Sequence, residues 1–192
     1  DGSSMAIAGS GQSVSPDGTS VGEVVLVTSD DHGTTWSRRA LPAEVARNAQ
    51  IRDLALSRDG RHILVAVAGV ACLSQDRGQT WQVVVPSDGG SISGVAISAD
   101  GNTLAVSLQS ADEVKLLLST DNGATWNRLN WHGAGTPRSL TLLEPGDRGL
   151  RMAAALEDSL SVSEDQGKSW RNLPLSHMPS AFAVTPDGVQ VL

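Results

Sequence analysis

Two pairs of acidic residues stand where they could act on a substrate. Asp112 and Glu113 follow one apolar run, and Glu157 and Asp158 follow another. Two carboxylates across a groove are what glycoside hydrolysis needs, because one protonates the leaving oxygen while the other attacks the sugar or activates water. Acidic residues on exposed turns are more often simply solvated. The pairs keep a glycosidase open as an alternative, and we assign no catalytic residue.

Two arginines occupy equivalent places in a repeated pattern. Arg52 precedes DLALS and Arg138 precedes SLTLL, while Ser93 and Ser180 stand at the same place in two other repeats. A pair of guanidinium groups can hold a carboxylate or a sulfate through bidentate hydrogen bonds. An ion pair with a neighbour such as Asp53 is the simpler interpretation. Arg52 and Arg138 are candidate ligand-binding residues.

One tryptophan lies outside the repeated motifs of the chain. Four of the five tryptophans belong to an octapeptide described below, and Trp131, in NRLNWHGAGTPRS, does not. An aromatic ring on a loop can stack on a sugar or anchor a protein partner. Packing between neighbouring elements is the alternative for Trp131, and simple solvation is the alternative for His132. Both residues are candidates for ligand binding.

An acidic octapeptide occurs four times, as SDDHGTTW, SQDRGQTW, STDNGATW and SEDQGKSW, and its first serine recurs every 44 or 45 residues. Asp-x-Gly could mark a calcium loop, but the acidic series and closing Glu of an EF-hand are missing, so we expect no metal and no cofactor. Asp can accept N–H groups within a turn, Gly allows the backbone to reverse, and Trp buries a large surface. The octapeptide is therefore predicted to stabilise the fold. Its structural residues are Ser29, Asp31, Gly33, Trp36, Ser74, Asp76, Gly78, Trp81, Ser119, Asp121, Gly123, Trp126, Ser163, Asp165, Gly167 and Trp170.

Short apolar runs between the octapeptides predict strands. A second marker, Ser-x-Asp-Gly or a variant of it, precedes each later copy: SRDG at Ser57, SADG at Ser98 and a looser LEPGD at Leu143. One repeat divides into strands A to D at residues 51–57, 62–68, 70–74 and 80–85. Such four-stranded meanders are the blades of propellers. We predict an all-β fold, a β-propeller or partial propeller of about four four-stranded antiparallel blades, with the octapeptide between strands C and D.

The repeats cover the whole chain as one domain, residues 1–192. The predicted blades span about residues 1–50, 51–91, 92–137 and 138–179, with a partial blade at 180–192. The first blade has no predicted strand A, and the last has only strands A and B. Open strand edges favour self-association or a place within a larger propeller.

The octapeptide resembles the Asp-box, or BNR repeat, of sialidases, sortilin-type receptors, photosystem II assembly factors and xyloglucanase-type glycosidases. All four copies match at Ser, Asp, Gly and Trp, although Ser169 replaces Thr in the last. The resemblance implies ligands on the face opposite the Asp-boxes, which the B–C loops and the links between blades form; residues 10–22 and 37–50 are two of these predicted loops. It also implies an extracytoplasmic location, secreted or periplasmic. Sialidase chemistry in that family uses a Tyr nucleophile, and this chain contains no Tyr. The expected function is a non-catalytic module that binds a protein or glycan; a xyloglucanase-like glycosidase is the alternative.

The composition excludes several other classes of partner. A net charge of -7 argues against non-specific binding to nucleic acid or to an anionic membrane. The apolar runs are only as long as strands, so no membrane insertion is expected. Cys72 is the single cysteine, which excludes an internal disulfide and suggests a buried apolar residue. Protein and carbohydrate remain as expected partners.

Overall fold

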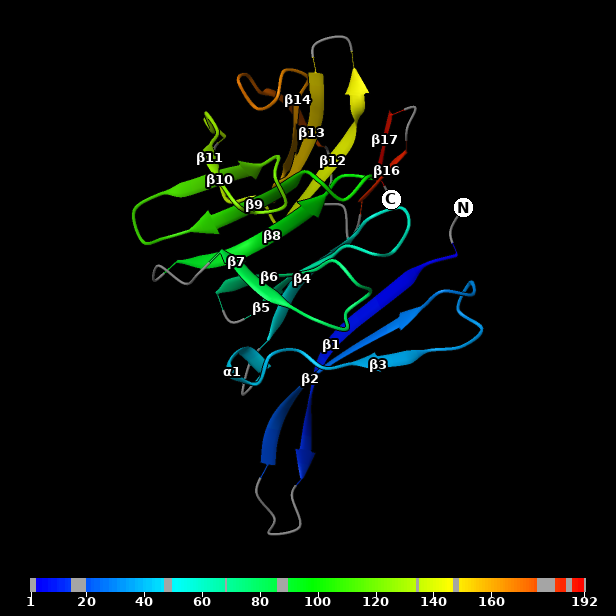
Figure 1. The fold of residues 1–192 in the computed structure, drawn as a ribbon. Helices are drawn as coiled ribbons and strands as arrows, with labels where there is room; N and C mark the ends of the chain where they lie inside the picture. Colours follow the sequence, from blue (N-terminus) through cyan, green and yellow to red (C-terminus); the bar gives the residue numbers. More distant parts are fainter. Residues whose placement is uncertain are drawn as a thin grey trace.

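The computed structural model of the chain describes residues 3–14, 20–46, 50–67, 69–85, 90–133, 135–146, 149–175, 182–185 and 188–191. Its strands form five antiparallel sheets, each a simple meander (Figure 1). Three sheets contain four strands, the first contains three and the last contains two in this part of the chain. This order confirms the predicted all-β repeat of four-stranded units.

The first sheet is β1 (Met5–Val14), β2 (Ser20–Ser29) and β3 (Ser37–Arg39). The second is β4 (Ile51–Leu56), β5 (Ile63–Val67), β6 (Val70–Ser74) and β7 (Gln82–Val85). The third is β8 (Ser91–Ile97), β9 (Leu104–Gln109), β10 (Val114–Ser119) and β11 (Asn127–Arg128). The fourth is β12 (Ser139–Gly146), β13 (Gly149–Ala155), β14 (Ser159–Ser163) and β15 (Arg171–Pro174). The last is β16 (Phe182–Thr185) and β17 (Gly188–Val191). We call these sheets blades one to five.

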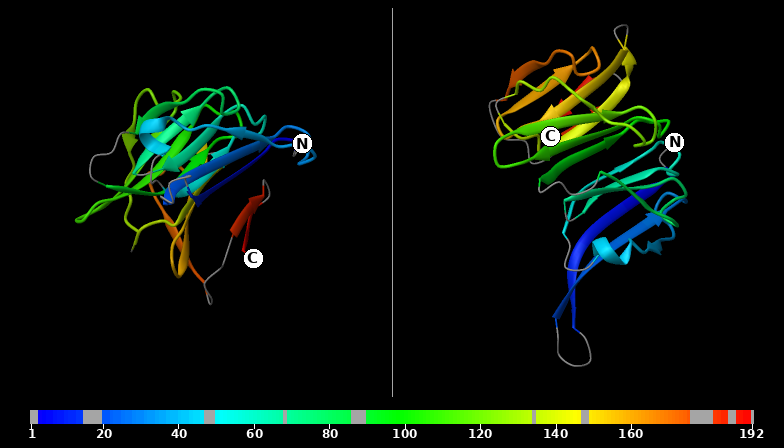
Figure 2. Two further views of the ribbon diagram at one scale, coloured as in Figure 1. Left: turned by 90° about the horizontal axis from the view of Figure 1, so that it is seen from below. Right: turned by 60° about the vertical axis from the view of Figure 1, so that its left-hand side comes forward.

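Blades one to four stack face to face in chain order, as the two views of Figure 2 show. Strand β5 is buried along its whole length, because blades cover it on both sides. Ile63, Val65 and Val67 pack toward Leu26 of blade one, whereas Leu64 packs toward blade three. Each blade therefore completes the core of its neighbours, as expected for a repeat protein.

The remaining contacts between blades follow the same pattern. Cys72 is fully buried between blades one and two, as its apolar surroundings in the sequence predict. Met152 and Leu116 belong to the cluster that joins blades three and four. In the described part of the chain, no helix is both long and apolar enough to span a bilayer.

Two segments that the sequence analysis assigns to loops contain regular structure. The expected loop at residues 10–22 is largely a hairpin, since β1 continues to Val14, β2 begins at Ser20, and the two pair along ten residues. Figure 1 shows this hairpin projecting beyond the other blades. The expected loop at residues 37–50 contains β3 and a single helical turn, α1 (Ala43–Ala46). Both segments lack the apolar periodicity on which strand and helix predictions depend.

Candidate functional site

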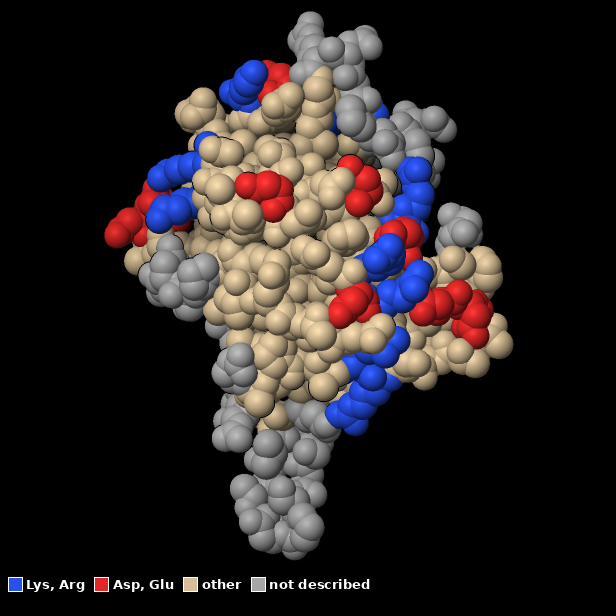
Figure 3. Space-filling model, viewed as in Figure 1, with Lys and Arg blue, Asp and Glu red and all other residues tan. Residues whose placement is uncertain are grey.

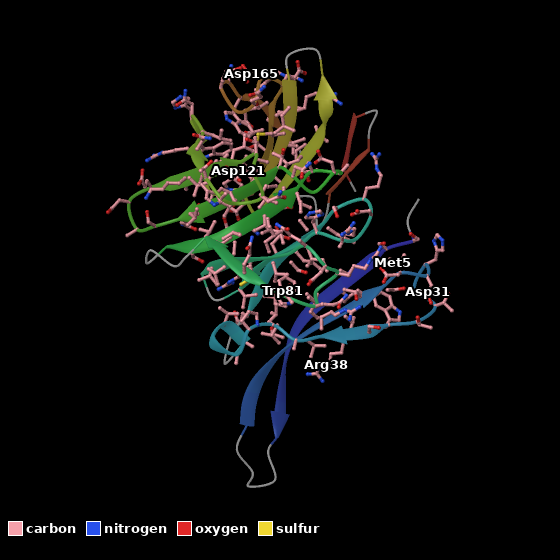
Figure 4. All side chains as sticks on the ribbon, in the orientation of Figure 1. Met5, Asp31, Arg38, Trp81, Asp121 and Asp165 are labelled. Atoms are coloured by element: carbon pink, nitrogen blue, oxygen red, sulfur yellow. The ribbon has the colours of Figure 1, made fainter. Side chains whose placement is uncertain are left out.

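Each Asp-box forms the same hydrogen-bonded turn between strands C and D. In the first copy, Ser29 Oγ donates to Asp31 Oδ1 at 2.8 Å and accepts the N–H of Gly33 at 2.9 Å. Asp31 Oδ1 also accepts the N–H of Thr35 at 2.8 Å, and its Oδ2 accepts the Thr35 hydroxyl at 2.7 Å. The other three copies repeat this set, with Ser169 taking the place of Thr. The carboxylates are therefore occupied in holding the turn; three of the four are labelled in Figure 4.

These hydrogen bonds change the acidity of the four Asp-box carboxyls. Hydrogen bonds from the Thr35 backbone and side chain lower the pKa of Asp31 to about 2. The side chain and backbone of Thr80, Thr125 and Ser169 lower the pKa of Asp76, Asp121 and Asp165 to about 2 in the same way. A carboxyl of such low pKa stays ionised at neutral pH and is a poor general acid. The Asp-box is a structural device.

A fixed contact joins each later Asp-box to the blade before it. A Cβ added at Gly78, Gly123 or Gly167 would meet Arg39, Val84 or Leu129 within 3 Å, and each of these neighbours lies at the outer strand of the preceding blade. In the third copy, Trp126 Nε1 also donates to the Val84 carbonyl at 3.0 Å. The boxes therefore link blade to blade as well as closing their own turns.

The first Asp-box has no such neighbour in the described structure. Trp36 is 41% exposed, and its Nε1 donates only within its own turn, to the Gly33 carbonyl at 2.9 Å. Met5 and Ile7, on the adjacent strand, are 42% and 57% exposed. The three later tryptophans are partly buried, whereas Trp36 is exposed because no described blade precedes it, so the prediction that each tryptophan buries a large surface fails for Trp36.

A pocket of about 500 Å³ lies at the opposite end of the blades, between blades three and four. Its wall comes from the starts of two A strands, two B–C loops and the link between the blades. These are the segments that the resemblance places on the ligand-binding face. The lining residues are Ser93, Gln109, Gly135, Thr136, Pro137, Arg138, Leu156, Glu157 and Asp158. We take this pocket as the candidate site.

Arg138 supplies the positive charge in the wall of this pocket. Its Nη2 lies 3.1 Å from Oε1 of Glu157, and the two side chains are 61% and 69% exposed. An ion pair this exposed contributes little to stability, so a ligand carboxylate can replace Glu157 at little cost. Ser93, at the equivalent position in blade three, forms a hydroxyl-to-hydroxyl hydrogen bond of 2.8 Å with Ser107. The pocket therefore offers a cation, two carboxylates and hydroxyl groups to a polar ligand.

The other candidate residues lie outside this pocket. Arg52 is exposed beside a bulge in β4, within blade two, so the structure does not bring it into the pocket with Arg138. Trp131 packs edge to face on Trp170 of the next Asp-box, with ring centroids 5.0 Å apart. His132 is exposed beside it. Contact between blades is thus the observed role of Trp131, and its role in ligand binding stays a prediction.

The two acidic pairs of the sequence lie in different parts of the structure. Glu113 forms ion pairs with Lys115 at 3.0 Å and Arg128 at 2.7 Å, on the outer strands of blade three. Only the pair Glu157 and Asp158 lines the pocket. Among the described residues, no group of three His, Cys, Asp or Glu is arranged to hold a metal ion.

Asp53 has a structural role that the sequence does not predict. Its Oδ2 accepts the N–H of Val95, in the next A strand, at 2.9 Å, and its Oδ1 accepts the N–H of Leu54 at 2.8 Å. Burial raises the pKa of Asp53, partly offset by these two hydrogen bonds. The carboxylate thus joins the inner strands of blades two and three. No signal in the sequence separates it from an ion-pair partner of Arg52.

Comparison with known proteins agrees with this geometry. Residues 27–38 match the model of the BNR/Asp-box repeat. The fold is similar to that of YCF48 bound to D1 peptide, with a TM-score of 0.58, 18% identity, and coverage of 98% of this chain and 64% of that one. It is also similar to a chain of a nidogen/laminin complex, with a TM-score of 0.64, 15% identity, and coverage of 94% and 66%. An ancestral GH74 enzyme gives a TM-score of 0.61 at 14% identity, over 88% of this chain but 25% of the enzyme.

No curated protein sequence matches the chain. The chain spans just under two thirds of the YCF48 and nidogen/laminin chains and a quarter of the GH74 enzyme. At these identities the likeness establishes the fold alone. The chain therefore has a β-propeller fold with a BNR/Asp-box repeat at residues 27–38 and three further copies of the same turn, which confirms the resemblance seen in its four octapeptides.

Proposed function

We propose that the chain is a non-catalytic propeller module that binds a protein partner through the pocket between blades three and four. The observation that carries the proposal is the exposed Arg138–Glu157 pair in the wall of a 500 Å³ pocket. A partner carboxylate can form bidentate hydrogen bonds with the guanidinium in place of Glu157. Pro137 and Leu156 provide apolar surface beside this polar contact.

The similar structures support a protein as the partner. One is YCF48 bound to D1 peptide, and another is a complex of nidogen and laminin. Both show this fold in proteins that engage other polypeptides. The resemblance also implies a glycan as an alternative ligand, and the experiment below includes it.

The experiment screens a phage library of random 12-residue peptides and a glycan array against the purified chain. Selected ligands should lose at least about tenfold in affinity on Arg138→Glu, because an acidic side chain repels the carboxylate that the guanidinium held. The matched control is Arg52→Glu, since Arg52 is the equivalent arginine outside the pocket. Equal affinity of both variants and the parent would contradict the proposed site.

A glycosidase is the second candidate, because Glu157 and Asp158 line the same pocket and an ancestral GH74 enzyme has a similar fold. The test uses xyloglucan oligosaccharides and chromogenic β-glycosides. Turnover that disappears on Glu157→Gln or Asp158→Asn would replace the binding-module proposal. Glycan binding that is lost on Trp131→Ala without any turnover would retain the module but make a sugar its ligand.

We also propose that copies of the chain self-associate through the exposed surface of Met5, Ile7 and Trp36. The equivalent surface of each later Asp-box is covered by the outer strand of the preceding blade, so β15 of a second copy could take that place. Light scattering should show a concentration-dependent rise in mass that Ile7→Lys abolishes. A constant monomer mass at micromolar concentration would contradict the proposal.

A further inference from the structure

The turns between strands A and B of blades two and three share a polar design. Ser57 Oγ donates to Asp59 Oδ1 at 2.7 Å and accepts the N–H of His62 at 3.0 Å. Ser98 repeats both bonds, with the Asp100 carboxylate at 2.5 Å and the N–H of Thr103 at 2.9 Å. One serine hydroxyl thus ties together both sides of each turn. These turns lie on the same end of the blades as the Asp-boxes.

The corresponding turn of blade four replaces this polar design with leucine. Leu143 stands at the serine position, as the LEPGD variant in the sequence indicates. Leu150 stands where blades two and three have Arg61 and Asn102. One hydrogen bond shows that these three residues are equivalent. The backbone carbonyls of Arg61, Asn102 and Leu150 each accept an N–H from the Asp-box of their own blade. Two polar positions of the repeat are therefore apolar in blade four.

This replacement loses hydrogen bonds and leaves apolar surface in water. A leucine cannot donate to a carboxylate or accept the N–H that the serine hydroxyl accepts. Leu142, Leu143 and Leu150 are all partly exposed at this turn. Leu142 and Leu150 pack in part against the apolar cluster between blades three and four, whereas Leu143 belongs to no apolar cluster of the described residues. Packing therefore accounts for part of two of these leucines and not for Leu143.

The three leucines form one wall of a pocket of about 350 Å³ among the A–B turns of blades two, three and four. The opposite wall is polar. The lining residues are Arg58, Ser98, Ala99, Asp100, Thr103, Leu142, Leu143 and Leu150. A neighbouring pocket of about 570 Å³ shares Arg58, Ala99 and Asp100 with it and continues toward Asp30 and Arg77. Charged side chains of both signs follow this end of the blades, along the right-hand edge of Figure 3.

Two carboxylates and a guanidinium border these pockets together. The carboxylates of Asp59 and Asp100 each accept a serine hydroxyl and a backbone N–H of their own turn. Hydrogen bonds from the Ser57 and Ser98 hydroxyls are the main cause that lowers the pKa of the two carboxyls, so both stay ionised at neutral pH. The exposed guanidinium of Arg58 borders both pockets and can meet an anion beside the leucines.

We propose that this pocket, on the Asp-box face, binds a protein segment that presents an aliphatic side chain and, two residues away, an acidic one. The aliphatic group packs against Leu142, Leu143 and Leu150, and the acidic group pairs with Arg58. An extended segment can place both groups at once, because side chains two residues apart lie on the same face. This site is separate from the proposed function at the pocket lined by Arg138, which lies at the other end of the blades.

The test titrates the isotope-labelled protein with the capped peptide acetyl-Ser-Leu-Gly-Glu-Gly-Ser-amide and follows leucine methyl signals by NMR. Saturable shifts should appear at Leu142, Leu143 and Leu150. Replacing the peptide's Leu with Gly should weaken binding about tenfold or more, since most of the buried apolar surface is lost. Replacing its Glu with Gln should weaken binding a fewfold.

Variants of the protein make the test specific. Leu143→Ser restores the residue of the other two turns, and Leu150→Asn restores that of blade three; each should weaken binding at least about fivefold while the melting temperature changes by a few degrees at most. Arg58→Gln should abolish the preference for Glu over Gln in the peptide. Arg138→Gln, at the opposite end, should change nothing. Unchanged affinity in both leucine variants, or methyl shifts confined to other leucines, would overturn the proposal.

Discussion

The first and third Asp-boxes have the same turn but different surroundings. In both, the serine hydroxyl donates to the Asp carboxylate at 2.8 Å, and the tryptophan Nε1 donates to the glycine carbonyl of its own turn. Only Trp126 also donates to the preceding blade, at the Val84 carbonyl. Trp36 is 41% exposed, whereas Trp126 packs against the cluster between blades two and three.

This difference separates what the octapeptide does alone from what a neighbour adds. The eight residues are sufficient to specify the hydrogen bonds of the turn, because those bonds lie within the segment. The burial of the tryptophan depends on the blade before it. The same sequence motif should therefore contribute different free energies of unfolding at different places in the chain.

The tryptophans should show the largest difference. Trp126→Ala removes an aromatic surface packed between two blades, and we expect it to lower the free energy of unfolding by about 3 kcal/mol. Trp36→Ala should cost less than about 1 kcal/mol, because much of that ring already meets solvent. Urea denaturation of both variants measures the comparison. Equal losses would mean that Trp36 is covered in solution, as self-association predicts, and dilution should then restore the difference.

The Asp-box glycines should show a smaller difference. Gly33 and Gly123 have φ angles of 81° and 85°, so alanine is strained at both. A Cβ at Gly123 would also lie 2.8 Å from Cβ of Val84, whereas the nearest contact at Gly33 is Met5 Sδ at 3.4 Å. We expect Gly33→Ala to cost about 1 kcal/mol, and Gly123→Ala about 2 kcal/mol. A Gly123→Ala, Val84→Ala double variant should recover the excess if the contact causes it.

The turns could be predicted from the sequence because every bond that forms them lies within a few residues. The A–B turn at Leu143 was visible as a variant of its marker for the same reason. Contacts between blades could not be predicted in this way. The packing of Trp131 on Trp170 joins residues 39 positions apart, and the Arg138–Glu157 pair depends on how two loops meet. Equivalent positions in a repeat predict a shared face; the partner of each side chain depends on the adjacent blade.

The Asp-box carboxylates should show how far the two turns are alike. The pKa of Asp31 and of Asp121 is about 2, against 3.8 for the free side chain. A lowered folded-state pKa stabilises the fold above about pH 4, and this contribution is lost as the pH falls toward 2. Asp31→Asn and Asp121→Asn should therefore destabilise the fold equally at pH 7, by less than the glycine changes, and the loss should vanish near pH 2. Urea midpoints measured from pH 7 to pH 2 test this; a loss that persists at pH 2 would point to a cause other than ionisation.

Substitution of the residue before an Asp-box glycine should change the free energy of unfolding least. His32, Arg77, Asn122 and Gln166 have φ angles of 57°, 61°, 56° and 63°. Asn tolerates this left-handed region better than most side chains, and only the third box has it. His32→Asn should therefore raise the free energy of unfolding by about 0.5 kcal/mol. His32 is exposed, so the substitution changes only the strain of the left-handed backbone conformation. His132→Asn is the matched control, since His132 is exposed without a positive φ, and it should leave stability unchanged. A gain at His132 as large as that at His32 would show that the side chain, and not the turn, is responsible.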